Sequence, residues 1–272
     1  MTLTDADFAY LRTLAAAQSG VQLDERRRYA VDSRVGDLVR ALPDVESPTA
    51  LVSTLRRGPV GALHMDVVEA LTTNETSFFR DSHPFEALGK GILPSLVEAR
   101  RHERTLSVWS AACSTGQEPY SVAMLLRDTP ACAGWNVRIV ASDISRNVLD
   151  RARAGCYSDF EVGRGLDATR RARWFARDGA SWQVNDDLRR SVDFRQVNLT
   201  GRWPSLPPFD VVLLRNVLIY FDTATKRMVL DRVRRALRPD GYLILGSTET
   251  LVDIESGWRR ERVGTTTWFR PD

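Results

Sequence analysis

The first seventy residues carry apolar side chains at spacings of three and four, which is the pattern of amphipathic helices. One such helical face contains Val31, Val35, Leu38 and Leu42. Ser47 followed by Pro48 is typical of a helix N-cap and a first-turn proline, and Gly20 and Gly58 stand where helices should end. The pattern predicts a small all-helical N-terminal domain of four short helices over residues 1–71.

From about residue 82 onward the pattern changes to nearly continuous apolar runs that are separated by amphipathic helices. The runs cover residues 106–112, 137–143, 210–216 and 241–247. Continuous apolar runs are typical of strands that are covered on both faces, and their alternation with helices predicts βαβ units around a mostly parallel sheet. We therefore expect an α/β domain over residues 72–272.

The regular alternation breaks at roughly residues 156–196, where we predict an insertion. A basic helical segment comes first, and the stretch SWQVNDDLRRSVDFRQV follows at residues 181–197. Its polar centre near residues 185–187 is typical of a turn between two strands. The sequence thus predicts a small antiparallel β insertion that contains this hairpin.

Composition narrows the class of protein. The 272 residues are 43% hydrophobic and 27% charged, with no stretch apolar enough to cross a bilayer. The N-terminal residues lack the features of a secretory signal, so we expect a cytoplasmic protein without membrane insertion. The 38 basic and 35 acidic residues give a net charge of +3, which is too balanced for nucleic acid as the main partner. The three cysteines and three histidines lack metal-ligand spacing, so we expect no metal.

Candidate ligand-binding residues follow the predicted strands, because ligands of open α/β sheets bind beyond the carboxyl ends of the strands. After the first run, Ala112, Ser114 and Gly116 either let the backbone approach a ligand or simply allow a tight turn. After the second run, Asp143 is placed to accept ribose hydroxyls, although Asp143 and Ser145 could instead cap the next helix. No G-x-G-x-x-G motif is present, which favours a nucleoside without phosphates over a dinucleotide.

Two further groups of polar residues need an explanation. Arg215, Asn216 and Tyr220 follow the buried run at 210–216, where they either satisfy loop carbonyls or line a ligand cleft. The segment TTNETSFFRD at residues 72–81 places hydrogen-bonding side chains beside two phenylalanines at the predicted domain junction. Packing between domains and a small-molecule site both explain that segment.

Together these strings resemble the CheR family of chemotaxis receptor glutamate O-methyltransferases over nearly the whole chain. The matching strings are TTNETSFFRD, ACSTGQEPYS, ASDIS, VNL, RNVLIYFD and PDGYLILGSTE, in that order. The resemblance implies a Rossmann-like S-adenosylmethionine-dependent methyltransferase domain, preceded by the helical domain and interrupted by the β insertion. It also implies S-adenosyl-L-methionine as the methyl donor and S-adenosyl-L-homocysteine as the product.

The resemblance further implies roles for individual residues. Cofactor contacts would come from Asn74, Thr76, Arg80, Glu118, Asp143, Asn198, Leu199, Arg215 and Asn216. Among these, Glu118 would reach the methionine portion, Asp143 would hold the ribose, and Asn198 with Leu199 would flank the adenine. Arg80 and Tyr220 would lie closest to the reacting centre as catalytic residues.

The partners implied are the cytoplasmic helical domains of chemotaxis receptors, and we expect the protein to act as a monomer. Family members that dock on a receptor pentapeptide resemble one another in a glycine-rich hairpin loop, whereas residues 177–187 here contain only Gly179. We therefore expect function without pentapeptide tethering, with the N-terminal domain recognising the receptor through Arg26, Arg27 and Arg28. The alternatives are a methyltransferase for a non-receptor protein and a cofactor-binding regulatory module, and intact Arg80 and Tyr220 favour an enzyme.

Overall fold

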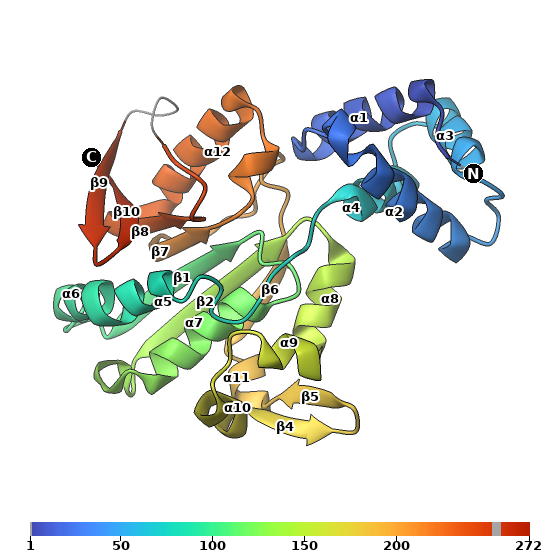
Figure 1. Cartoon of the computed structure of the whole chain (residues 1–272). Helices are drawn as coiled ribbons and strands as arrows, with labels where there is room; N and C mark the ends of the chain where they lie inside the picture. Colours follow the sequence, from blue (N-terminus) through green and yellow to red (C-terminus); the bar gives the residue numbers. More distant parts are fainter. Residues whose placement is uncertain (1, 252–256) are drawn as a thin grey trace. The chain divides into compact units, whose positions relative to one another are not determined.

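The computed structural model describes residues 2–251 and 257–272, and the chain divides into two compact units (Figure 1). The helical unit comprises Met1–Thr73, Asn198–Arg202 and Tyr220–Lys226. The α/β unit comprises Asn74–Val197, Trp203–Ile219 and Arg227–Asp272. The N-terminal helices and the strands thus belong to different units.

Short amphipathic helices form the helical unit. They are α1 (Asp5–Ser19), η1 (Glu25–Arg27), α2 (Arg28–Ala41), α3 (Pro48–Arg57) and α4 (Ala62–Leu71). The predicted capping residues are confirmed: the Ser47 hydroxyl accepts a hydrogen bond from the Ala50 N–H at 3.1 Å, and Gly20 ends α1 with a φ of 76°. Of the predicted apolar face, Val31 and Val35 of α2 are buried and Leu38 is half-buried, whereas Leu42 is half-buried just after the helix ends.

Two segments from much later in the sequence complete the helical unit. The Asn198 side-chain amide donates to the Gln18 carbonyl at 2.6 Å, and the Gln22 N–H donates to the Tyr220 carbonyl at 2.7 Å. A Cβ added to Gly20 would lie 2.7 Å from the Thr200 methyl carbon. Gly20 is therefore needed for its positive φ and for this close approach.

A seven-stranded sheet organises the α/β unit, with strand order β6-β2-β1-β7-β8-β10-β9. Its strands are β1 (Thr105–Ala111), β2 (Asn136–Asp143), β6 (Val192–Gln196), β7 (Phe209–Leu214), β8 (Leu237–Leu245), β9 (Trp258–Val263) and β10 (Thr266–Pro271). The first five strands in this order run parallel, whereas β10 is antiparallel to both β8 and β9. Every residue of β7 is buried, which explains its continuous apolar sequence.

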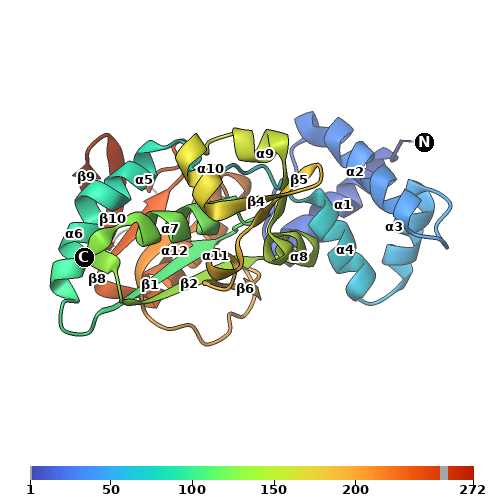
Figure 2. The same cartoon turned by 90° about the horizontal axis from the view of Figure 1, so that it is seen from below.

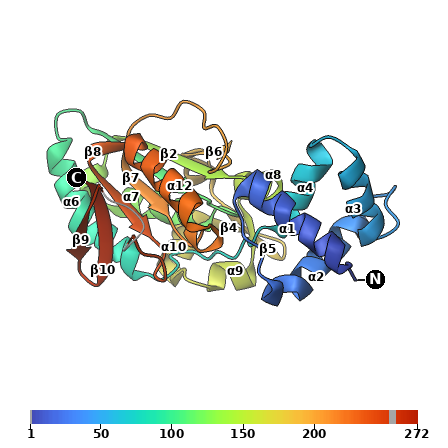
Figure 3. The same cartoon turned by 90° about the horizontal axis from the view of Figure 1, so that it is seen from above.

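Helices cover both faces of this sheet. Figures 2 and 3 show α7 (Gln117–Asp128) on one face and α12 (Thr223–Ala236) on the other, as right-handed crossovers in opposite directions require. The other helical segments are α5 (His83–Ala87), η2 (Leu88–Ile92), α6 (Leu93–Ala99), η3 (Pro130–Cys132), α8 (Arg146–Ala154) and η4 (Leu218–Tyr220). Fully buried Trp109, Tyr120 and Trp268 are among the largest core side chains. Among the described residues, no helix combines the length and apolarity that crossing a bilayer requires.

A second, three-stranded antiparallel sheet has the order β3-β5-β4. It consists of β3 (Cys156–Ser158), β4 (Phe175–Asp178) and β5 (Ser181–Val184), accompanied by α9 (Asp159–Gly163), α10 (Ala168–Trp174) and α11 (Asp186–Arg189). The predicted hairpin with its turn near residues 185–187 is wrong. Asn185 instead caps α11 by accepting the Leu188 N–H at 3.2 Å, and β6 after that helix joins the large sheet beside β2. The hairpin lies earlier, between β4 and β5.

The strand order places a topological switch point between β1 and β7. From β1 the chain adds β2 and β6 on one side, while β7 and β8 extend the sheet on the other. Ligands of such sheets bind at the carboxyl ends of the strands beside this point. This arrangement confirms the predicted Rossmann-like fold with a helical N-terminal part and a small antiparallel sheet.

Candidate functional site

Backbone strain is concentrated at the carboxyl ends of the central strands and in the segment that precedes α5. Seven non-glycine residues with positive φ are found in the described chain: Phe79, Asp81, Ser82, Arg104, Ala112, Ser114 and Asn216. All except Arg104 lie in the loops after β1 and β7 or between residues 79 and 82. Left-handed backbone costs a non-glycine residue of order 1–3 kcal/mol and clusters at functional sites. These three segments therefore define the candidate site.

Asp143 ties together the loops that follow β1 and β2. Its carboxylate accepts the Ser114 N–H at 2.9 Å and the Ser145 N–H at 3.0 Å, and the residue is only 6% exposed. The Ser145 hydroxyl, rather than Asp143, caps α8 by accepting the Val148 N–H. Because each carboxylate oxygen has two lone pairs, Asp143 can hold this loop and still accept hydroxyl donors from a ligand.

A buried arginine links the strand ends to the segment before α5. The Arg215 guanidinium, with a side chain 1% exposed, donates to Glu118 Oε2 at 2.9 Å and to Asp81 Oδ2 at 2.8 Å. It also donates to the Arg80 carbonyl at 3.0 Å, while the second Glu118 oxygen accepts the Ser110 hydroxyl at 2.8 Å. Two carboxylates thus neutralise a cation that would otherwise be very costly to bury. Glu118, Arg215 and Arg80 are held in one network.

The segment that contains Asn74, Thr76 and Arg80 is anchored on the loop after β1. The Ser114 hydroxyl donates to the Asn74 carbonyl at 2.8 Å, and the Arg80 guanidinium donates to the Glu75 carbonyl at 2.9 Å. Thr76 is half-buried in the same segment. The neighbouring Phe78 is fully buried in the core, so the segment serves packing as well as the candidate site.

The loop after β7 depends on a residue that the sequence analysis missed. Asn216, with a φ of 60°, donates its backbone N–H to Glu249 Oε2 at 2.7 Å. The same oxygen accepts the Gly246 N–H at 2.7 Å, and Oε1 accepts the Ile219 N–H at 3.3 Å. Glu249 therefore joins the end of β7 to the turn after β8. An acidic residue four positions after the last residue of β8 was the available signal.

The remaining predicted residues belong to the helical unit. Asn198 bonds Gln18 as described above, Leu199 is buried, and the Tyr220 ring lies under the Arg27 guanidinium at 5.0 Å. The structure thus groups Asn74, Thr76, Arg80, Glu118, Asp143, Arg215 and Asn216 in the α/β unit. Asn198, Leu199 and Tyr220 belong to the helical unit.

The chemistry of the grouped side chains fits S-adenosylmethionine. Asp143 and Glu118 supply carboxylate oxygens, which suit a ribose hydroxyl, an ammonium group and a nearby sulfonium. The described residues contain no group of three or more His, Cys, Asp or Glu that could hold a metal ion. Burial raises the pKa of the Cys113 thiol well above its usual range, so this thiol beside the site is a packing group rather than a nucleophile.

Comparison with known proteins identifies the family. Residues 74–267 match the model of the CheR methyltransferase, SAM binding domain. "Chemotaxis protein methyltransferase 1" of Pseudomonas aeruginosa is 41% identical over 93% of this chain and 93% of its own length. "Chemotaxis protein methyltransferase Cher2" of Pseudomonas putida is 38% identical, covering 92% of both chains. "Chemotaxis protein methyltransferase 1" of Vibrio cholerae serotype O1 is also 38% identical, over 93% of this chain and 92% of its own. The chain therefore belongs to the CheR methyltransferase family, and it is an S-adenosylmethionine-dependent methyltransferase of chemotaxis.

Proposed function

We propose that the protein transfers a methyl group from S-adenosylmethionine to glutamate side-chain carboxylates of chemotaxis receptors, forming methyl esters. The observation that supports this most directly is the network around Arg215. It joins Glu118, a proposed cofactor residue, to the backbone of Arg80, a proposed catalytic residue. Rigid coupling of a cofactor-binding group to a group beside the acceptor suits a reaction that depends on alignment.

For the cofactor, we assign Asp143 to the ribose and Glu118 to the methionine portion. Asn74, Thr76, Arg215 and Asn216 complete these contacts within the α/β unit. The assignment agrees with the placement of Asp143 and Arg215 at the carboxyl ends of β2 and β7. Asn198 and Leu199 remain proposed adenine neighbours on the strength of the VNL string.

The reaction requires alignment and desolvation more than proton transfer. A bound sulfonium supplies the electrophilic methyl group. The acceptor glutamate, with an ordinary pKa near 4.3, is already ionised at neutral pH, so no general base is needed. Attack joins a cation and an anion into neutral products, which a site of low dielectric constant favours. We assign the orientation of the acceptor carboxylate to Arg80 and Tyr220.

We further propose that the receptor is recognised without a tethering pentapeptide. The turn between β4 and β5 consists of two residues, Gly179 and Ala180, which supports this proposal because it leaves little loop for a peptide. If Arg26 and Arg28 recognise the receptor, they must first release the carboxylates with which they form ion pairs in the protein. Arg26 pairs with Asp24 at 2.6 Å, and Arg28 pairs with Asp5 at 2.6 Å, so an acidic receptor surface must compete with these carboxylates.

The test is to incubate the protein with labelled S-adenosylmethionine and receptor membranes, and to measure label that base releases as methanol. We expect base-labile label on receptor glutamates and a kcat/KM that stays nearly flat from about pH 6 to pH 9. Arg80→Ala should lower turnover roughly 100-fold through misalignment. Exposed Arg101→Ala, which lies away from the site on the segment after α6, is the matched control. Base-stable label, or wild-type turnover by Arg80→Ala, would contradict the proposal.

A further inference from the structure

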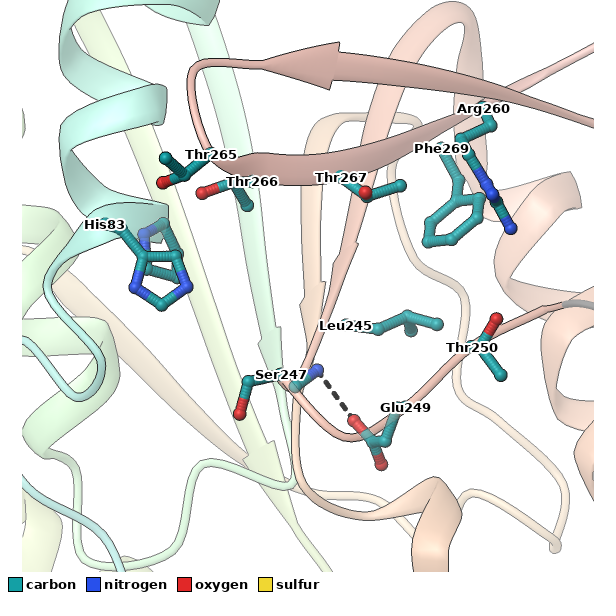
Figure 4. A pocket seen from close by; sticks show the side chains of 12 residues that line it. His83, Leu245, Ser247, Glu249, Thr250, Arg260, Thr265, Thr266, Thr267 and Phe269 are labelled. Carbon is teal, nitrogen blue, oxygen red and sulfur yellow. Dashed lines mark hydrogen bonds between the residues drawn. The ribbon is translucent and has the colours of Figure 1, made fainter.

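A polar cavity of about 330 Å³ lies in the α/β unit between the N-terminus of α5, the carboxyl end of β8 and the hairpin of β9 and β10 (Figure 4). His83, Ser247, Glu249, Arg260, Thr266 and Phe269 are among the residues that line it. In Figure 4 the Arg260 side chain is at one end of the cavity, and His83 is at the other with Thr265 and Thr266. The volume is at the lower end of the range for ligand sites and suits a single side chain.

The cavity adjoins both segments that carry proposed catalytic and cofactor residues. A Cβ added to Gly246, which lines the cavity, would lie 2.7 Å from the Asn216 side-chain amide. His83, on the opposite wall, follows directly after the strained turn that contains Arg80 and Asp81. A group that enters this cavity therefore lies beside the loops that organise methyl transfer.

The wall of the cavity offers hydrogen-bond donors and one positive charge. Within residues 2–251 and 257–272, no carboxylate forms an ion pair with the exposed Arg260, and hydroxyl-bearing Ser247, Thr265 and Thr267 also line the cavity. An arginine without a carboxylate partner at the wall of a cavity can pair with a carboxylate of a ligand. Among the residues that the structure describes, Glu249 is the one carboxylate that lines the cavity, and it already accepts three backbone N–H groups, which offset its charge. The cavity thus favours an anionic group.

We propose that this cavity is a substrate subsite that receives an acidic side chain of the protein substrate, close to the acceptor glutamate. This inference rests on the proposed function, because it takes a helical segment as the substrate. On such a helix, residues three or four positions apart share a face and lie next to each other. Arg260 supplies the charge partner for the second carboxylate. The subsite selects glutamates that have an acidic neighbour on the same helical face.

The experiment measures kcat and KM for methylation of a soluble cytoplasmic receptor fragment, at saturating S-adenosylmethionine. Arg260→Gln should raise the KM for the fragment about three- to tenfold with little change in kcat, as expected for loss of a partly exposed charge pair. Arg259→Gln is the matched control, because Arg259 is the exposed neighbour on β9 whose side chain points to the opposite face.

The acidic partner is then located on the substrate. Each Asp or Glu three or four positions from the acceptor is changed to its amide, and the KM is measured with wild-type protein and with Arg260→Gln. One substitution should raise the KM for the wild type and have no further effect with Arg260→Gln, since the pair is already broken. Equal KM values for Arg260→Gln and Arg259→Gln would overturn the subsite, as would a raised KM for S-adenosylmethionine instead. Failure of the wild type to form any ester would contradict the proposed function itself.

Discussion

Replacing Glu249 tests whether a single carboxylate holds the end of β7 in its strained form. Glu249 accepts the N–H groups of Asn216 and Gly246 at 2.7 Å and that of Ile219 at 3.3 Å. Glu249→Gln keeps the size of the side chain and removes its charge. The amide oxygen can still serve Asn216 and Gly246, but the amide nitrogen then faces the Ile219 N–H as a second donor.

The expected cost follows from these three contacts. Hydrogen bonds to a charged group contribute about 1.5–3 kcal/mol, whereas neutral ones contribute about 0.5–1.5 kcal/mol. The contact with Ile219 is long and exposed, so water replaces it at little cost. We therefore expect Glu249→Gln to destabilise the α/β unit by about 1–2 kcal/mol, and Glu249→Ala to cost about 1 kcal/mol more because Asn216 and Gly246 lose their acceptor.

Denaturant unfolding measures the global effect, and amide hydrogen exchange at Asn216 and Gly246 measures the local one. Both amides should exchange faster in Glu249→Gln than in the wild type. Amides of the distant strand β2 should exchange faster only to the extent that the global free energy of unfolding is lowered. Glu46→Gln, a change at an exposed glutamate of the helical unit, serves as the control. Unchanged exchange at these two amides, together with wild-type unfolding, would refute the idea that Glu249 holds this loop.

Four further substitutions test separate parts of the structure. Asp143→Asn should weaken S-adenosylmethionine binding at least tenfold in calorimetry, because an amide keeps only one acceptor oxygen. Gly20→Ala should destabilise the helical unit by about 1–3 kcal/mol through positive φ and close contact, whereas Gly36→Ala inside α2 should stabilise it by up to about 1 kcal/mol in thermal unfolding. A hydrogen bond from Arg100 lowers the pKa of Asp240 below its ordinary value of 3.8. The ionised Asp240 therefore stabilises the folded protein above that pH, and this stabilisation is lost as the pH falls below it. Asp240→Asn should accordingly make the free energy of unfolding depend less steeply on pH in that acidic range.

The sequence predicted the positions that depend on strand ends and missed those that depend on tertiary contacts. Asp143 and Arg215 were found because each follows an apolar run, and the carboxyl ends of parallel strands meet at one edge of a sheet. The prediction of a hairpin turn at residues 185–187 was wrong because Asn185 suits a helix cap as well as a turn. Only the pairing of β6 with β2 decides between the two. The intramolecular partners of Arg26 and Arg28 carry no local sequence signal.

Glu249 was missed for a more general reason, which also explains how the site is built. Three of the strained residues are each held by a charged side chain from a distant part of the chain. The Ser114 N–H is held by Asp143, the Asp81 carboxylate by Arg215, and the Asn216 N–H by Glu249. Charged hydrogen bonds of this kind are strong enough to offset the backbone cost at each position.

These long-range contacts form only when the strands of the sheet are in register, so the strained loops are a product of the completed fold. A residue such as Glu249 touches backbone rather than ligand, and its side chain can be exchanged for a neutral one without removing any proposed cofactor contact. At saturating protein substrate, turnover should therefore respond to Glu249 through the backbone that it holds, at Asn216, Gly246 and Ile219. Arg215 differs from Glu249 in this respect. Arg215 both holds Asp81 and carries a proposed cofactor role, whereas Glu249 positions backbone groups and has no proposed cofactor contact.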